Sequence, residues 1–350
     1  MAAEWQPAGP PGNGAGLTSP RLRSQPSSHA CSRSGHPCAY ACDGAWQISA
    51  ERDAKRGKDT ARFLAAGAEL HPCGITPDTR PPNPPAAMGP DLRSLAYANS
   101  MPQHLPDMAY GADERQRLDL YLPDRDRAPL FFFIHGGGWR GGDKAEYRPL
   151  AEVLVKFGYA VALPNHRLAP MHRHPAQIED VAAALGFLLR GSRESGIETT
   201  GICLAGHSSG GHLAALLALH PEHLKRNGAE PRQIAGVISI CGVFDLTCYR
   251  GGEDGYLAAA FGNDAELYRD ASPLFHATAT APPFFLAYAE RDYPGAGEQA
   301  AAMEAKLAAC GVPARNLRVA GRDHVTILTG VRSMLDPLAV NLALFLRSIR

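Results

Sequence analysis

A serine flanked by glycines stands where a buried strand is expected to turn into a helix. Residues 206–210 read Gly-His-Ser-Ser-Gly, a match to the pattern G-x-S-x-G. An apolar stretch at 202–205 precedes the motif and an Ala/Leu-rich stretch follows it, which is the context such a motif needs. Glycines at the crowded flanks allow a sharp turn that leaves the hydroxyl of Ser208 at its tip. We therefore predict that Ser208 is a nucleophile; the alternative is a serine that only caps the helix.

A serine hydroxyl becomes a strong nucleophile only when a base removes its proton. His324 lies in the loop after the last expected strand, and Asp292 directly follows the strand before it. The order Ser208, Asp292, His324 is the Ser-Asp-His order that accompanies a strand–turn–helix nucleophile. Glu290 and Asp323 are the alternative acids. Glu290 falls within the strand end. Asp323 is adjacent to His324 in sequence, so its carboxylate is poorly placed to reach the imidazole ring.

A glycine-rich loop follows another expected buried strand. Residues 134–139 read Ile-His-Gly-Gly-Gly-Trp, and successive glycines allow a backbone with exposed N–H groups. We expect Gly136 and Gly137, with the N–H of Ser209, to stabilise the oxyanion of a tetrahedral intermediate. Trp139, in the same loop, is expected to contact the substrate. A phosphate-binding loop would end in Lys followed by Ser or Thr, whereas this loop ends in Trp-Arg.

Strands and helices alternate from about residue 117 onward. Continuous or alternating apolar stretches predict strands, and apolar residues at helical spacing predict helices between them. The expected strands are 118–122, 129–134, 159–163, 201–205, 235–241, 283–288 and 317–319. The expected helices are 147–157, 175–190, one that follows the serine motif through 219, 298–310 and 337–349. This alternation predicts an α/β fold with a mostly parallel central sheet and helices on both faces.

The first quarter of the chain has a different composition. Residues 1–90 hold 13 of the 29 prolines and four of the eight cysteines. We predict a disordered Pro/Gly-rich leader over 1–88, which need not be translated, and a catalytic domain over 89–350. Met88 or Met101 would then begin the protein, and a short helix is expected within 50–70. Zinc binding is disfavoured for the cysteines and histidines of this part because their spacing lacks paired C-x2-C: Cys31, Cys38, Cys42, Cys73, His29, His36 and His71.

Charge and hydropathy exclude several classes of protein. The chain of 350 residues carries 35 basic and 35 acidic side chains, so it has no net attraction to nucleic acid or to an anionic membrane. No apolar run reaches the length of a membrane-spanning helix, and the first residues lack the features of a secretory signal. We therefore expect a cytoplasmic protein with reduced cysteines, no cofactor, no metal, no nucleic-acid partner and no membrane partner. The oligomeric state stays open.

Over about residues 115–350 the chain resembles the α/β-hydrolase superfamily, in particular its HGGG-bearing branch of hormone-sensitive-lipase-like carboxylesterases and acetyl or feruloyl esterases. The resemblance rests on His-Gly-Gly-Gly at 135–138, Arg-Leu-Ala-Pro at 167–170, the serine motif, Asp292 and Arg-Asp-His at 322–324. The chain is also similar to kynurenine formamidase, through the stretches 135–144 and 242–246. Two departures are a histidine at 166, where most such esterases carry tyrosine, and a short N-terminal cap, which argues against large acyl groups.

The resemblance implies a serine hydrolase that cleaves small carboxylic esters through an acyl-enzyme intermediate. An arylformamidase that cleaves N-formylkynurenine is the alternative, with Arg140, Lys144 or Arg250 holding the amino-acid head group. A non-catalytic binding module on the same fold is a third reading, disfavoured because the nucleophile, base, acid and oxyanion elements are all present. The expected partner is a small-molecule ester or formamide.

Overall fold

The computed structural model describes residues 103–249, 256–331 and 333–350. Several expectations lie outside the described residues: the leader, the helix within 50–70, the cysteines and histidines weighed as zinc ligands, the two alternative starts and Arg250. The first residues of the domain predicted to begin at 89 lie outside them as well.

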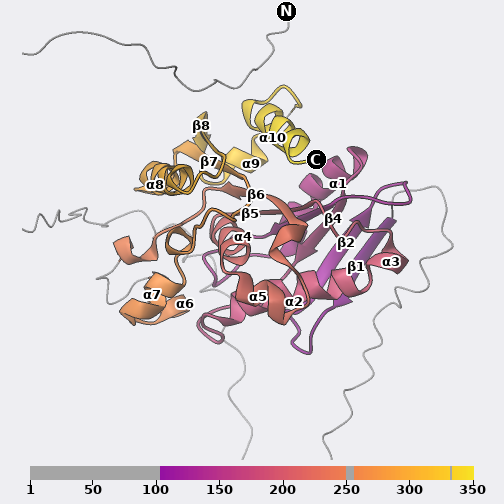
Figure 1. Ribbon diagram of the computed structural model, residues 1–350, viewed down its shortest axis with the longest axis horizontal. Coiled ribbons are helices and arrows are strands. Elements are labelled where there is room, and N and C mark those ends of the chain that lie inside the picture. The colour runs from indigo at the N-terminus through magenta and orange to yellow at the C-terminus, as the bar shows by residue number, and fades with distance from the viewer. Residues whose placement is uncertain (1–102, 250–255, 332) are drawn as a thin grey trace, which may run out of the picture. The chain divides into compact units, whose positions relative to one another are not determined.

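Eight strands form one sheet in the order β1-β2-β4-β3-β5-β6-β7-β8 (Figure 1). Neighbours from β4 to β8 pair in parallel, whereas β1 and β2 pair antiparallel to their neighbours. The mostly parallel sheet predicted from the sequence is therefore confirmed. The strands are β1 Gln103–Ala109, β2 Arg117–Leu122, β3 Leu130–Ile134, β4 Ala160–Pro164, β5 Ile202–His207, β6 Ile234–Ile240, β7 Phe284–Arg291 and β8 Ala314–Asp323.

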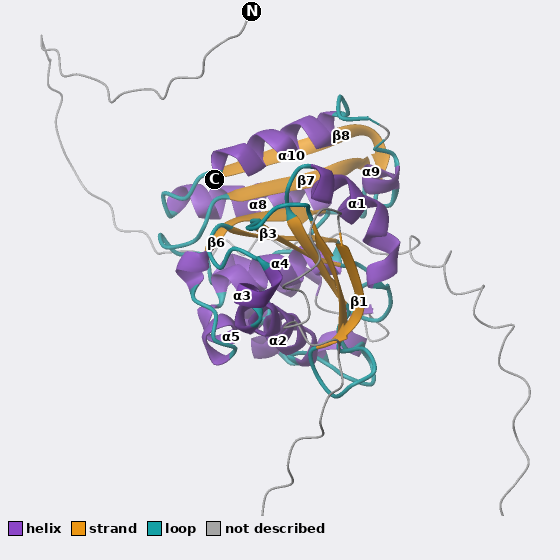
Figure 2. Ribbon diagram, turned by 90° about the vertical axis from the view of Figure 1, so that its right-hand side faces the viewer, coloured by secondary structure: helices purple, strands orange, loops and turns teal. Residues whose placement is uncertain are grey.

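Helices cover both faces of this sheet (Figure 2). Apolar residues of α2, α4, α5 and α8 pack with one face, and those of α1, α9 and α10 pack with the other. The longer helices are α1 Arg148–Lys156, α2 Ala176–Arg190, α4 Ser209–Leu219, α8 Ala296–Ala309 and α10 Pro337–Ser348. The shorter ones are α3 Ser192–Ser195, α5 Pro221–Arg226, α6 Tyr256–Phe261, α7 Ala265–Asp270 and α9 Thr326–Thr329. Within the described residues, the 3-10 turns are η2 Lys144–Tyr147, η3 Pro231–Gln233, η4 Leu246–Tyr249 and η5 Pro273–Phe275.

Continuous burial explains why the central strands read as unbroken apolar runs. Every residue of β3, β4 and β5 is buried, because helices lie over both faces. Helix α4 is buried along its whole length, which accounts for its Ala/Leu-rich composition. The carboxyl ends of the parallel strands meet at one edge of the sheet, so the loops that follow β3, β5, β7 and β8 converge there.

Among the described helices, none combines the length and the apolar character that crossing a membrane requires.

Candidate active site

Ser208 lies in a strained turn between β5 and α4. Its φ of 55° and ψ of −122° fall in a region that side chains rarely adopt. A Cβ at Gly206 would lie 2.2 Å from the carbonyl oxygen of Gly210, and one at Gly210 would lie 2.1 Å from that of Ile134. Both flanking glycines are therefore required by close backbone approach. The hydroxyl of Ser208 makes no capping bond to α4, so capping does not account for this serine.

The structure brings Ser208, His324 and Asp292 into one hydrogen-bonded series. Nε2 of His324 lies 3.0 Å from Oγ of Ser208. Nδ1 of His324 lies 2.6 Å from Oδ1 of Asp292. Because the carboxylate only accepts hydrogen bonds, the proton of a neutral ring belongs on Nδ1, which leaves Nε2 to accept from the serine hydroxyl.

Asp292 is held from several directions, and only 3% of its side chain is exposed. The backbone N–H of Ala289 donates to Oδ2 at 3.0 Å, and that of Tyr293 donates to Oδ1 at 2.9 Å. Burial by itself raises the pKa of Asp292, but hydrogen bonds from His324, the Cys241 thiol and the Ala289 N–H outweigh it, so the pKa lies below its ordinary value. The carboxylate therefore stays ionised while it orients the imidazole.

The two alternative acids face other partners. Glu290 pairs with Arg318 at 2.9 Å and accepts from the N–H of Gly321 at 2.7 Å. Asp323 accepts from the backbone N–H of Thr326 at 2.8 Å. These bonds account for both carboxylates as local structural groups, Glu290 near the end of β7 and Asp323 at the end of β8.

A second series of hydrogen bonds connects the glycine loop to His324. The N–H of Gly136 donates to the hydroxyl of Tyr147 at 3.1 Å, and that hydroxyl lies 3.0 Å from Nδ1 of His207. Nε2 of His207 donates to the carbonyl of His324 at 2.8 Å. Since a carbonyl can only accept, the direction of every bond is defined. Burial is the main reason that the pKa of His207 falls to about 4, so the ring is neutral at pH 7.

Sequence reasoning did not single out Tyr147 or His207. His207 fills a variable position of the serine motif, and its place next to Ser208 could have marked it as part of the site. Tyr147 lies in η2, and nothing in the sequence around it marks it as part of the site.

The three expected oxyanion donors differ in their surroundings. Ser209 begins α4 directly after the nucleophile, and Gly137 is exposed with a φ of 118°. A Cβ at Gly137 would lie 2.2 Å from the carbonyl oxygen of Gly141, so glycine is required there. The N–H of Gly136 already has an acceptor in Tyr147. For Gly136 to serve as a donor, its N–H has to exchange that hydroxyl for the oxyanion.

Trp139 packs into the core instead of facing solvent. Only 4% of the residue is exposed. Its indole N–H donates to Nδ1 of His212 at 3.2 Å, and its ring meets Phe261 edge-on with centroids 4.9 Å apart. This burial argues against the predicted contact with substrate.

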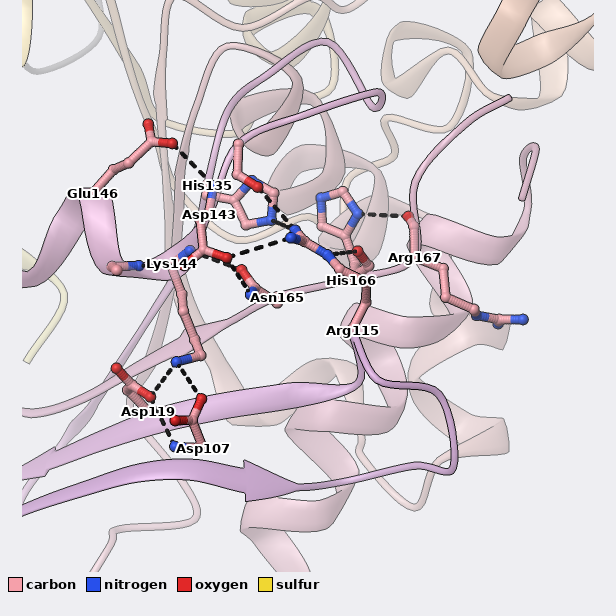
Figure 3. A network of polar contacts seen from close by, with 12 residues as sticks. Asp107, Arg115, Asp119, His135, Asp143, Lys144, Glu146, Asn165, His166 and Arg167 are labelled. Carbon is pink, nitrogen blue, oxygen red and sulfur yellow. Dashed lines mark hydrogen bonds and ion pairs between the residues drawn. The ribbon is translucent and has the colours of Figure 1, made fainter. Parts of the chain in front are cut away.

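Polar side chains from distant parts of the chain anchor the glycine loop (Figure 3). Arg115, between β1 and β2, donates to the carbonyl of Gly142 at 2.8 Å and pairs with Asp143 at 3.3 Å. Asn165, after β4, accepts from the N–H of Lys144 at 2.7 Å and donates to Asp143 at 2.7 Å. These bonds hold the far end of the loop from two separate parts of the chain.

Lys144 is buried between two carboxylates (Figure 3). Only 8% of its side chain is exposed, and Nζ lies 2.5 Å from Asp119 and 2.8 Å from Asp107. Burial lowers its pKa, but the two carboxylates outweigh burial and the net pKa is raised. Lys144 is therefore not a cation for a substrate head group, which corrects one of the three expectations for a formamidase. Arg140 is exposed, and Arg250 lies outside the described residues.

Two stacked histidines lie beside the loop (Figure 3). The rings of His135 and His166 are 4.4 Å apart and nearly parallel. Each donates from Nδ1 to a backbone carbonyl, at 2.7 Å for His135 and 2.9 Å for His166. Burial lowers the pKa of both rings, to about 4 for His166. Both are therefore neutral packing groups at pH 7.

Among the described residues, two groups of side chains place metal-ligating atoms within 4.8 Å of one another. The first is His207, Cys241 and His324, whose imidazoles already take part in the two hydrogen-bonded series. The second, His220, Asp270 and His276, lies away from these series.

The family model BD-FAE matches residues 118–307, more than half of the chain. This chain therefore belongs to the BD-FAE family and has the α/β-hydrolase fold, as the resemblance in the sequence implied.

Individual relatives agree with this assignment. The chain is 30% identical over 264 residues to the probable carboxylic ester hydrolase LipM of Mycobacterium tuberculosis, covering 70% of this chain and 59% of LipM. It thus spans less than two thirds of that relative. It is 30% identical over 151 residues to kynurenine formamidase of Danio rerio, covering 43% of this chain and 49% of that protein. The structure of esterase B from Lactobacillus rhamnosis matches with a TM-score of 0.60 and 25% identity, over 73% of this chain and 89% of that one.

Proposed function

We propose that this protein hydrolyses small carboxylic esters with Ser208 as nucleophile, His324 as general base and Asp292 as the orienting acid. One observation carries the proposal: Nε2 of His324 is 3.0 Å from the serine oxygen while Nδ1 is 2.6 Å from the carboxylate. A nucleophile next to a base that a third group orients is the arrangement that acyl transfer needs. The names of the relatives LipM and esterase B support an ester as substrate.

The geometry defines two chemical steps. In the first, His324 takes the proton of Ser208 as Oγ bonds to the carbonyl carbon, and the ring then gives that proton to the departing alcohol. The product is an acyl-serine ester. In the second, His324 takes a proton from water, the resulting hydroxide attacks the acyl carbon, and the bond to Oγ breaks as the serine recovers a proton. Asp292 stabilises the imidazolium that forms twice.

The oxyanion forms beside the start of α4 in both steps. The N–H of Ser209 and that of Gly137 are proposed as its donors, with Gly136 joining when its N–H leaves the Tyr147 hydroxyl. A donor of this kind contributes about 3 kcal/mol to the transition state. The catalytic residues and all three donors lie within the domain proposed to span 89–350.

A formamidase is the alternative because of the similarity to kynurenine formamidase over 151 residues. A formyl group needs little acyl space, but the amino-acid head group needs a cation close to the cleft. The burial of Lys144 removes one of the three cations considered for that role. Ester hydrolysis is therefore the function that the site supports best.

Labelling with a fluorophosphonate tests the nucleophile in the full chain. We expect one adduct per chain, mapped by peptide mass spectrometry to Ser208, and none in Ser208→Ala. Ser348→Ala, which changes a serine at the end of α10, is the matched control and should label normally. An adduct that persists in Ser208→Ala would contradict the proposal.

A substrate panel then separates the two activities. Hydrolysis of p-nitrophenyl acetate, butyrate and octanoate is compared with that of N-formylkynurenine. We expect the acetate and butyrate to be turned over with the highest kcat/KM. A higher value for N-formylkynurenine than for every ester would establish the alternative instead.

A further inference from the structure

Three histidines and one aspartate converge where α4 passes into α5. His220 joins these two helices, and His223 lies one turn later on α5. Asp270 ends α7 and His276 follows η5, about fifty residues further along the chain. His220, Asp270 and His276 place one ligand atom each within 4.8 Å of one another. The fold thus brings together side chains that bind transition metals, from three separate elements.

The distances in this cluster are close to those of a loaded site. Nε2 of His220 lies 3.7 Å from Oδ1 of Asp270. Ligand atoms about 2.0–2.1 Å from a tetrahedral zinc ion are about 3.4 Å apart, so this pair needs a shift of a few tenths of an ångström. The ring of His220 is 4.6 Å from that of His276 and 4.7 Å from that of His223, measured between centroids. His276 and His223 therefore both lie next to His220, the ring that faces Asp270.

The hydrogen bonding of His276 suits a metal ligand. His276 donates from Nε2 to the carbonyl of Asp270 at 2.6 Å, which leaves the lone pair of its Nδ1 for a metal. A bond from the second ring nitrogen to a carbonyl is typical of histidines that bind metals.

We propose that His220, Asp270 and His276 bind a zinc ion, with His223 as the fourth ligand. Three imidazoles and one carboxylate form a donor set that zinc prefers in tetrahedral geometry. The ion would fasten α7 and η5 to the junction of α4 and α5. Ser208 precedes the other end of α4, whose 11 residues span about 16 Å, so the role of the ion is structural.

Zinc titration by calorimetry on the full chain, stripped of metal beforehand, tests this site. We expect His220→Gln and His276→Gln to weaken zinc binding at least tenfold, since even partners of metal ligands are worth about 10–100-fold. The matched control is His172→Gln. His172 lies 3.7 Å from Asp113, the same separation as His220 from Asp270, and should leave zinc binding unchanged. Equal zinc affinity in all these proteins, or no binding by the wild type, would overturn the proposal.

Two further measurements keep the test independent of folding and of other sites. Asp270 is more than half exposed, so Asp270→Asn should fold normally and still weaken zinc binding. Zinc should also raise the melting temperature of the wild type more than that of Asp270→Asn. Cobalt bound to this cluster should give visible bands without thiolate charge transfer, because no ligand is cysteine. A thiolate band that is unchanged in His220→Gln would assign the metal to cysteines elsewhere and would overturn the proposal.

Discussion

The two sides of the candidate active site are held by different forces. On one side, Asp292 and His324 are positioned by backbone N–H groups and by each other, within loops that directly follow β7 and β8. On the other side, the glycine loop after β3 is held by Arg115, which reaches the Gly142 carbonyl from between β1 and β2, and by Lys144, which pairs with Asp119 of β2. The first arrangement depends on local chain geometry. The second depends on buried charge, which is costly to disturb once one partner is removed.

A single chain of hydrogen bonds connects these two sides. It runs from the Gly136 N–H through Tyr147 and His207 to the carbonyl of His324. Substitutions on either side can therefore be compared in the same two measurements. The value of kcat shows the effect on catalysis, and the free energy of unfolding shows the effect on stability.

The largest effect is expected on the triad side. Ser208→Ala and His324→Ala should each lower kcat by about 10⁴–10⁶-fold, because nucleophile and base act as a unit. The double variant should be little worse than either single one. Steady-state kinetics with p-nitrophenyl acetate measure this, and circular dichroism checks the fold. Losses that multiply in the double variant would show that the two residues act independently.

On the loop side, Lys144→Met should destabilise the protein by about 3–5 kcal/mol, because the buried Asp119 carboxylate loses the ammonium group that lies 2.5 Å from it. Urea unfolding measures the change. Lys156→Met, at the exposed end of α1, is the matched control and should stay within about 0.5 kcal/mol of the wild type. A kcat that falls with Lys144→Met and not with Lys156→Met would show that the charges position the loop. Equal stability of the two variants would contradict the proposal that Lys144 anchors the loop.

The connection between the two sides can be tested at Tyr147. Tyr147→Phe removes the only hydroxyl between the Gly136 N–H and His207, so the free energy of unfolding should fall by about 1–3 kcal/mol. Because the N–H of Gly136 is then free for the oxyanion, kcat should be retained or rise. Tyr121→Phe, which deletes a buried hydroxyl that has no partner, should be neutral. A kcat more than tenfold lower in Tyr147→Phe would show that the hydroxyl itself acts in catalysis.

The smallest effect concerns acid stability, to which both sides contribute a buried neutral histidine. The pKa values of His166 and His207 are lowered by burial to about 4, from 6.5. Between these values the unfolded chain binds protons that the folded chain does not, so stability falls as the pH falls from 6.5 to 4. Each ring contributes at most about 1.4 kcal/mol per pH unit to this slope.

His166→Phe should reduce that slope by up to the contribution of one ring, measured by urea unfolding at several pH values. His172→Phe, at a half-exposed position, is the control. An unchanged slope in His166→Phe would mean that this ring takes up its proton without loss of the fold.

Much of the fold and the positions of the reactive residues follow from local sequence pattern. The apolar runs predicted seven of the eight strands, and the strand–motif–helix order predicted the turn at Ser208. Strand β1 was missed because its sequence, QHLPDMA, includes a proline and mostly half-exposed or exposed positions, so it has no clear apolar period. Helices α3, α5, α6, α7 and α9 were missed because four to six residues are too few to show periodicity.

The sequence by itself determined which residues can do chemistry here, since a serine between close-packed glycines and a histidine and an aspartate after successive strands are local features. Only the tertiary structure decided how the glycine loop is held and which of its groups are buried. Lys144 meets Asp119 across 25 positions of the chain, and the indole of Trp139 meets His212 across 73. Local pattern carries no information on such pairings, because packing between distant segments determines which polar groups are buried together.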